Sequence, residues 1–204
     1  MNNTKERIIS TTERLLRRQG FTGTGLKQIV AEANAPFGSL YHFFPGGKEQ
    51  LGAEVISSAG LMYQNLVTGV FDAAPDIVQG VRDCFDGAAA VLRETDYADA
   101  CPIETVALEV ASTNETLRTA CAEVFESWIV EATRRFTDAG IPKSAARDLA
   151  VMVISALEGA FVLARGMKDA RHVEIAGTFA ASAVQDALRQ TRRVKTATRA
   201  RTRR

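Results

Sequence analysis

The chain has few of the residues that build metal and redox sites. Its 204 residues include three cysteines and two histidines. Cys84, Cys101 and Cys121 lie far apart in sequence, and no two of them have the C-x-x-C spacing of metal and dithiol sites. An odd number of isolated cysteines also gives no disulfide framework. We therefore expect no metal site, no disulfide and no bound cofactor.

Groups arranged for catalysis are equally scarce. The sequence shows no Ser-His-Asp spacing and no glycine-rich loop of the kind that cradles phosphates. The two histidines, His42 and His172, are far in sequence from every cysteine, so no nucleophile has an adjacent base. An enzyme is the rival class of function, and we do not expect one.

Proline and alternating strand-like patterns are also rare. With five prolines and few β-branched alternations, the chain is expected to be all-α. Its length and 46% hydrophobic residues suit one or two domains with a sizeable core. The first residues, MNNTKERIIS, lack the apolar core of a signal peptide, which predicts a protein of the reducing cytoplasm.

Charge is distributed unevenly along the chain. The net charge is only +1, but residues 1–50 carry +3, residues 51–190 carry −9 and residues 191–204 carry +7. A basic end beside an acidic middle would steer a polyanion onto one face of the protein. The basic tail, TRRVKTATRARTRR, has two interpretations: a disordered, solvated end, or a sequence-independent contact to DNA phosphates.

Residues 24–48, TGLKQIVAEANAPFGSLYHFFPGGK, predict two short helices joined by a tight turn. Thr24 is placed to cap the first helix with its hydroxyl, and Asn34 tolerates the left-handed conformation that ends a helix. Pro36 is favourable in the first turn of the second helix. One apolar stripe with helical spacing lies between these signals: Leu26, Ile29, Val30 and Ala33.

The second of these helices has polar and aromatic residues that no core requires. Leu40 and either Phe43 or Phe44 are positioned to pack inward. The other side presents Phe37, Ser39, Tyr41 and His42, with Gly38 permitting close approach of a partner's backbone. Together with Lys48 these residues supply donors and a cation suited to a DNA duplex. The alternative is an ordinary αα-hairpin with a solvated face.

The run IVAEANAPFGSLYHFFPGGKEQL, residues 29–51, resembles the DNA-binding signature of the TetR family of bacterial transcriptional regulators. The segments CPIETVALE and SALEGA further downstream look like the LmrA/YxaF-type branch. The resemblance implies an N-terminal three-helix helix-turn-helix head and a C-terminal helical domain for ligand binding and dimerisation. The expected DNA-contacting residues are Thr24, Lys27, Gln28, Phe37, Gly38, Ser39, Tyr41, His42 and Lys48.

Helical periodicity and turn residues divide the chain further. We expect a DNA-binding domain over residues 1–50, an effector-binding and dimerisation domain over 51–190, and the basic tail over 191–204. The expected helices outside the helix-turn-helix cover residues 4–19, 48–71, 76–94, 102–110, 115–139, a segment containing 149–164, and 173–188.

Residues 149–164, LAVMVISALEGAFVLA, are apolar on nearly every side of a helix. The run is too short, and carries Glu158 too centrally, to be a convincing membrane span. A second subunit is therefore the expected cover for this helix and the final one, in a two-fold four-helix bundle. The predicted interface residues are Met152, Leu157, Phe161, Phe179, Ala183, Val184 and Leu188.

Large apolar residues from several helices suggest either one cavity or a close-packed core. The resemblance favours a pocket for a small, apolar or aromatic effector. Its expected lining is Phe71, Phe85, Leu92, Cys101, Ile103, Val106, Phe125, Trp128, Met152, Glu158 and Phe161. Glu158 would be costly to bury alone, so it should meet either a structural partner or the ligand.

The sequence thus predicts a homodimeric repressor that binds a palindromic operator and is released by a small molecule. An effector-independent or activating regulator is the first alternative. A DNA-packaging protein that uses the basic tail is the second, but it leaves the acidic middle without a role.

Overall fold

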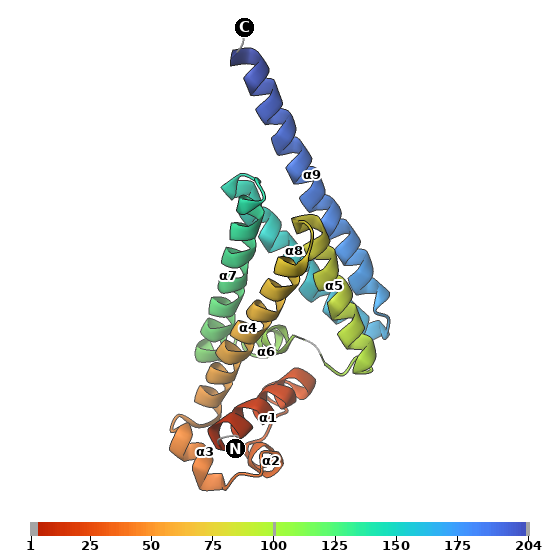
Figure 1. The fold of residues 1–204 in the computed structure, drawn as a ribbon. Helices are drawn as coiled ribbons and strands as arrows, with labels where there is room; N and C mark the ends of the chain where they lie inside the picture. Colours follow the sequence, from red (N-terminus) through yellow and green to blue (C-terminus); the bar gives the residue numbers. More distant parts are fainter. Residues whose placement is uncertain (1–3, 100, 203–204) are drawn as a thin grey trace. The chain divides into compact units, whose positions relative to one another are not determined.

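The computed structural model describes residues 4–99 and 101–202, and the regular secondary structure of this part of the chain consists of nine helices, with no strand (Figure 1). The prediction of an all-α fold is confirmed. The helices are α1 (Thr4–Gln19), α2 (Leu26–Glu32), α3 (Phe37–Phe43), α4 (Gly47–Ala73), α5 (Ile77–Glu94), α6 (Pro102–Val110), α7 (Glu115–Asp138), α8 (Lys143–Met167) and α9 (Arg171–Thr202).

The chain divides into two compact units. The described residues within 1–65 and 98–126 form the first, here called the head unit, and those within 66–97 and 127–204 form the second, the body unit. This division differs from the expected boundary at residue 50. Helix α4 continues past that point, and its residues Leu51, Val55 and Ile56 are fully buried in the head unit, as is Ile103 of α6. The apolar periodicity of α4 therefore extends the head unit beyond the helix-turn-helix.

The core of the head unit is built from one apolar face of each short helix. Ile8 and Leu16 of α1, Ile29 of α2 and Leu40 of α3 are at most 1% exposed. Helix α1 packs against α2, α3 and α6. Helices of seven residues, such as α2 and α3, are too short to be stable alone. Packing into this shared core therefore stabilises them.

The body unit is held by close packing of α5, α8 and α9. Its core combines Phe85 and Leu92 with many alanines, among them Ala150, Ala160 and Ala164. Small side chains let helices approach closely: a Cβ placed on Gly177 of α9 would lie 2.5 Å from Cβ of Phe85. The body core therefore depends on shape complementarity between large and small residues.

Helix α9 is longer than expected. The sequence pattern predicts an end near residue 188, but the helix continues to Thr202 and so includes most of the basic tail. The physical reason is that no glycine or proline follows Gly177, while alanine and arginine favour helix. The last two residues of the predicted tail, 203 and 204, lie outside the described residues.

Helix α8 has the length and apolar composition that a membrane span requires. This is weak evidence, because core helices meet the same criteria. In α8, Ala146, Ala150, Ala160 and Ala164 are buried in the body core. Leu149, Val153, Leu157 and Phe161 pack against the same core and are partly buried. The packing accounts for one side of the helix, while Val151, Met152, Val162, Leu163 and Met167 are exposed.

Candidate nucleic-acid interface

The turn between α2 and α3 is fixed by local conformation and by one long-range side chain. Asn34 has a φ of +49°, which confirms the predicted left-handed residue, and Pro36 precedes the first turn of α3. Arg7 of α1 donates to the carbonyl oxygens of Ala33 and Asn34, each at 3.0 Å. These bonds satisfy carbonyls at the end of α2 and orient α3 against α1.

Helix α3 presents an open aromatic face. Leu40 and Phe44 are fully buried, whereas Phe37 and Tyr41 remain 45% and 48% exposed. The rings of Phe37 and Tyr41 lie 5.8 Å apart between centroids. Gly38 and His42 are also exposed, and Ser39 is half-buried. The predicted contact residues of α3 therefore lie together on the surface of this helix.

The expected contacts from α2 divide into two kinds. Lys27 is exposed, while Gln28 is half-buried and engaged in a polar network. Its side-chain oxygen accepts from Gln19 and its amide donates to Glu32, both at 2.9 Å. Lys27 is therefore the more available of the two for a phosphate.

Thr24 has a different role from the one expected. Helix α2 begins after Gly25 and has no side-chain cap, so the predicted Thr24 cap is wrong. The Thr24 side chain is fully buried, and its hydroxyl donates to the carbonyl oxygen of Gly20 at 2.6 Å. Because its hydroxyl closes the turn between α1 and α2, we no longer assign Thr24 a direct contact with DNA.

Lys48 is in the first turn of α4 and is only half exposed. Its Nζ lies 4.3 Å from the centroid of the Phe21 ring, a cation–π arrangement. Burial lowers the pKa of this ammonium, and the nearby charge of Glu109 opposes that shift. The cation expected to meet DNA thus also belongs to the base of the head.

The expected effector residues are divided between the units. Cys101, Ile103, Val106 and Phe125 belong to the head unit, and the other seven to the body unit: Phe71, Phe85, Leu92, Trp128, Met152, Glu158 and Phe161. Phe85 and Leu92 are buried in the body core, with Phe71 and Phe161 packed against it. Glu158 is half-buried on α8.

The expected dimer residues differ in exposure. Phe179 is 72% exposed and Met152 36%, while Leu157, Phe161, Ala183 and Leu188 are half-buried. Val184 is fully buried among the core residues of its own unit. Its side chain therefore fills the body core, and we withdraw it from the interface.

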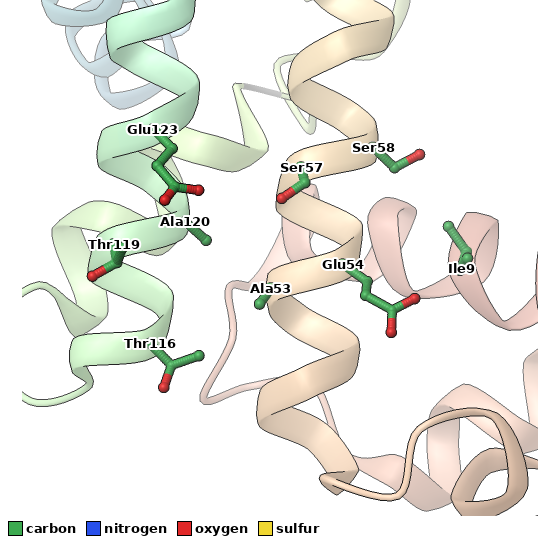
Figure 2. Close-up of a pocket in the computed structure, with 9 residues that line it drawn as sticks. All are labelled: Ile9, Ala53, Glu54, Ser57, Ser58, Thr116, Thr119, Ala120 and Glu123. Atoms are coloured by element: carbon green, nitrogen blue, oxygen red, sulfur yellow. The ribbon is translucent and has the colours of Figure 1, made fainter.

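A shallow groove of the head unit lies elsewhere (Figure 2). Residues from α1, α4 and α7 line it: Ile9, Ala53, Glu54, Ser57, Ser58, Thr116, Thr119, Ala120 and Glu123. Glu54 in its wall is engaged with Lys5 at 3.1 Å and with Gln50 at 2.9 Å. None of the expected effector residues belongs to this lining.

Two families match this sequence. Residues 8–55 match "Bacterial regulatory proteins, tetR family", and residues 77–178 match "Transcriptional regulator LmrA/YxaF-like, C-terminal domain". The chain is 35% identical over 167 residues to the regulator YxaF of Bacillus subtilis, covering 82% of this chain and 87% of that one. It is 30% identical to LmrA of the same organism over 167 residues, covering 82% and 89%.

Solved structures show the same fold. A TetR transcriptional regulator from Legionella pneumophila superposes with a TM-score of 0.78 at 24% identity, over 88% of this chain and 96% of that one. The fold, the helix-turn-helix and the sequence matches together identify the protein as a DNA-binding transcriptional regulator, and not as an enzyme. The chain belongs to the TetR family, and its C-terminal domain is of the LmrA/YxaF type.

Proposed function

We propose that this regulator is a homodimeric repressor that binds a palindromic operator in the cytoplasm and is released by a small apolar or aromatic molecule. The observation that carries the proposal is the outward face of α3. Two aromatic rings remain nearly half exposed there, on a helix that is anchored by the fully buried Leu40 and followed by the fully buried Phe44. A rigid, exposed recognition helix suits insertion into the major groove.

Roles within this face follow from chemistry. Phe37 is suited to apolar contact with a thymine methyl group, and Ser39 to a hydrogen bond with a base edge. Tyr41 and His42 carry donors for phosphate or bases, and Gly38 leaves room for the DNA backbone. Lys27 adds an exposed cation on α2.

Dimerisation is supported by the uncovered apolar side of α8 and α9. These helices expose Val162, Leu163, Met167, Ile175 and Phe179 between 49% and 72%. Large apolar side chains exposed on two helices that pack against each other favour a protein–protein interface there. A two-fold interface built from it would present two copies of α3, which must stand about 34 Å apart to enter successive major grooves.

Release by an effector requires a ligand that prefers a different separation of the two heads. Such a ligand weakens operator binding by linkage, since each ligand shifts the same conformational equilibrium. We assign the effector to apolar residues of the body unit, with Phe71, Trp128, Phe161 and Glu158 as its first candidates.

The test begins with operator selection from a random duplex library by the full-length protein. The selected duplex should bind at least about 1,000-fold more tightly than random duplex. Phe37→Ala and Ser39→Ala should change the selected sequence, whereas Tyr41→Phe should weaken all duplexes. No preference above random duplex would reject the proposal.

The dimer is tested separately with Phe179→Arg. Phe179 is mostly exposed, so this change should leave the fold intact while placing two charges in the interface. Sedimentation should then show monomers, and operator affinity should fall sharply. An intact dimer would contradict this placement.

The effector is tested with a library of aromatic compounds. Some of them should raise the melting temperature of the protein and also weaken its binding to the operator.

A further inference from the structure

Glu109, in the last turn of α6, binds the turn that connects α1 to α2. Its Oε2 accepts a hydrogen bond from the backbone N–H of Phe21 at 2.6 Å, and its Oε1 accepts from that of Thr22 at 2.7 Å. Both carboxylate oxygens are thus used on two consecutive amides. Charge-assisted bonds of this kind are shorter and stronger than neutral ones.

The backbone of the turn is shaped around this carboxylate. Gly20 has a φ of +73°, a conformation that favours glycine. A Cβ at this position would lie 2.6 Å from Oε2 of Glu109. A larger residue would therefore both strain the turn and displace the carboxylate. The hydroxyl of Thr24 closes the other side by donating to the carbonyl oxygen of Gly20.

Phe21 brings a third helix to the same place. Its ring contacts Gly52 of α4, where an added Cβ would lie 2.9 Å from the ring, and the Lys48 ammonium lies over it. Burial lowers the pKa of the Lys48 ammonium, and the negative charge of Glu109 opposes that shift. We call Glu109, the amides of Phe21 and Thr22, and Lys48 the Glu109 clasp.

The beginning of α6 is fastened to α1 as well. Asp99, just before α6, accepts from Nε of Arg18 at 2.9 Å and lies 3.6 Å from Nε of Arg17. Asp99 is only 9% exposed. Carboxylates at both ends of α6 therefore bind the C-terminal end of α1 and the turn that follows it. Glu109 binds the backbone of the chain that leads into α2 directly.

We propose that Glu109 is a positioning residue for DNA recognition: it holds the α1–α2 turn, and so sets how α2 and α3 are presented to the duplex. The proposal rests on the DNA-binding function and goes beyond it, since Glu109 belongs to none of the expected contact positions. Its charge alone would act in the opposite direction. An anionic group in the head unit repels phosphates, so its removal by itself should strengthen binding to every duplex.

Loss of the positioning role should weaken operator binding, whereas loss of the negative charge alone should strengthen it. Glu109→Gln therefore distinguishes the two roles. Glutamine has the same shape, but one of its two terminal atoms is a donor and cannot accept from an amide. We expect hydrogen exchange at the Phe21 and Thr22 amides to accelerate about tenfold or more. Affinity for the selected operator should fall about tenfold, while affinity for random duplex should stay constant or rise.

Glu115→Gln is the matched control. Glu115 is an exposed carboxylate in the same unit, paired with Arg118 within α7, so this variant removes the same charge and leaves the clasp intact. It should not accelerate exchange at the two amides, nor reduce operator affinity.

Glu109→Asp is the second variant, because it keeps the charge but has a side chain one methylene shorter. Hydrogen exchange at the Phe21 and Thr22 amides and affinity for the operator should change in the same direction as in Glu109→Gln.

Three outcomes would overturn the proposal. Exchange at Phe21 and Thr22 that stays as in the unaltered protein would show that the carboxylate does not hold the turn. A rise in affinity for operator and random duplex together would show that only its charge matters. Equal losses on both duplexes would show a general defect. Amide exchange is measured without DNA, so it remains informative if no operator is found.

Discussion

The head unit and the body unit are stabilised in different ways. In the head, two helices of seven residues each are positioned by directional polar bonds: Arg7 to the α2–α3 turn, Thr24 to Gly20, and Glu109 to the α1–α2 turn. In the body, helices of 18 residues or more pack through alanines, glycines and large apolar residues.

This difference suits different tasks. A bundle held by close packing resists small displacements, because shifted helices lose contact over their whole length. The head unit also has an apolar core, but its recognition helices are short, so a few polar bonds can decide how they are oriented within that unit. We infer that the precision of DNA reading depends on named polar contacts, whereas the stability of the molecule depends on the body core. Four predictions test this contrast.

The largest effect is expected from Phe85→Ala in the body core. Phe85 is 1% exposed and packs against Gly177, so its truncation leaves a cavity. The free energy of unfolding should fall by about 3–5 kcal/mol, measured by urea denaturation. In the Phe85→Ala background, Gly177→Ala should cost less than it does alone, because the added methyl then has space. Equal costs in the two backgrounds would argue against this packing.

A smaller loss of stability is expected from Arg7→Met in the head. This change keeps the apolar stem and removes the two hydrogen bonds to Ala33 and Asn34, at a cost of about 1–2 kcal/mol. Thermal unfolding measures it. Arg14→Met, which breaks the exposed ion pair with Glu32, should change the melting temperature very little. If the two variants behave alike, the α2–α3 turn does not depend on Arg7.

Lys48→Gln tests whether the Lys48 ammonium contacts DNA phosphates or acts mainly within the Glu109 clasp. Since its ammonium already lies over Phe21, we expect the slope of log affinity against log salt to fall by less than about one unit. Lys27→Gln removes an exposed cation of α2 and should lower that slope by about one unit. Equal reductions would assign both lysines to DNA phosphates.

The smallest effect on stability is expected from removal of residues 192–204. Among the described side chains, Leu188 is the last in α9 that packs against the body core, so we expect an unchanged melting temperature. The segment carries seven Lys or Arg and no acid. If it contacts phosphates, truncation should reduce the salt slope for random duplex by up to about six units. A variant with Thr196 and Thr198 changed to Ala keeps the charge and should retain the slope.

Much of this architecture was predictable from local sequence. Apolar spacing identified the helices, Asn34 marked the turn, and the exposed side of α3 followed from which residues the core did not need. The errors were contextual. Thr24 carries the signature of a cap, yet the helix starts later and its hydroxyl bonds backward to Gly20. The sequence position of Val184 suggests a place in the dimer interface, but its side chain is buried in the core of the body unit.

The amino-acid sequence by itself determined that the protein is helical, where its helices form, and that it carries a helix-turn-helix, because these follow from periodicity and turn chemistry within a few residues. Only the tertiary structure decided which groups hold that motif in place. Glu109 meets Phe21 across 88 positions, and Arg7 meets Ala33 across 26. No local pattern encodes such pairs, since they exist only once α1, α2 and α6 share one core.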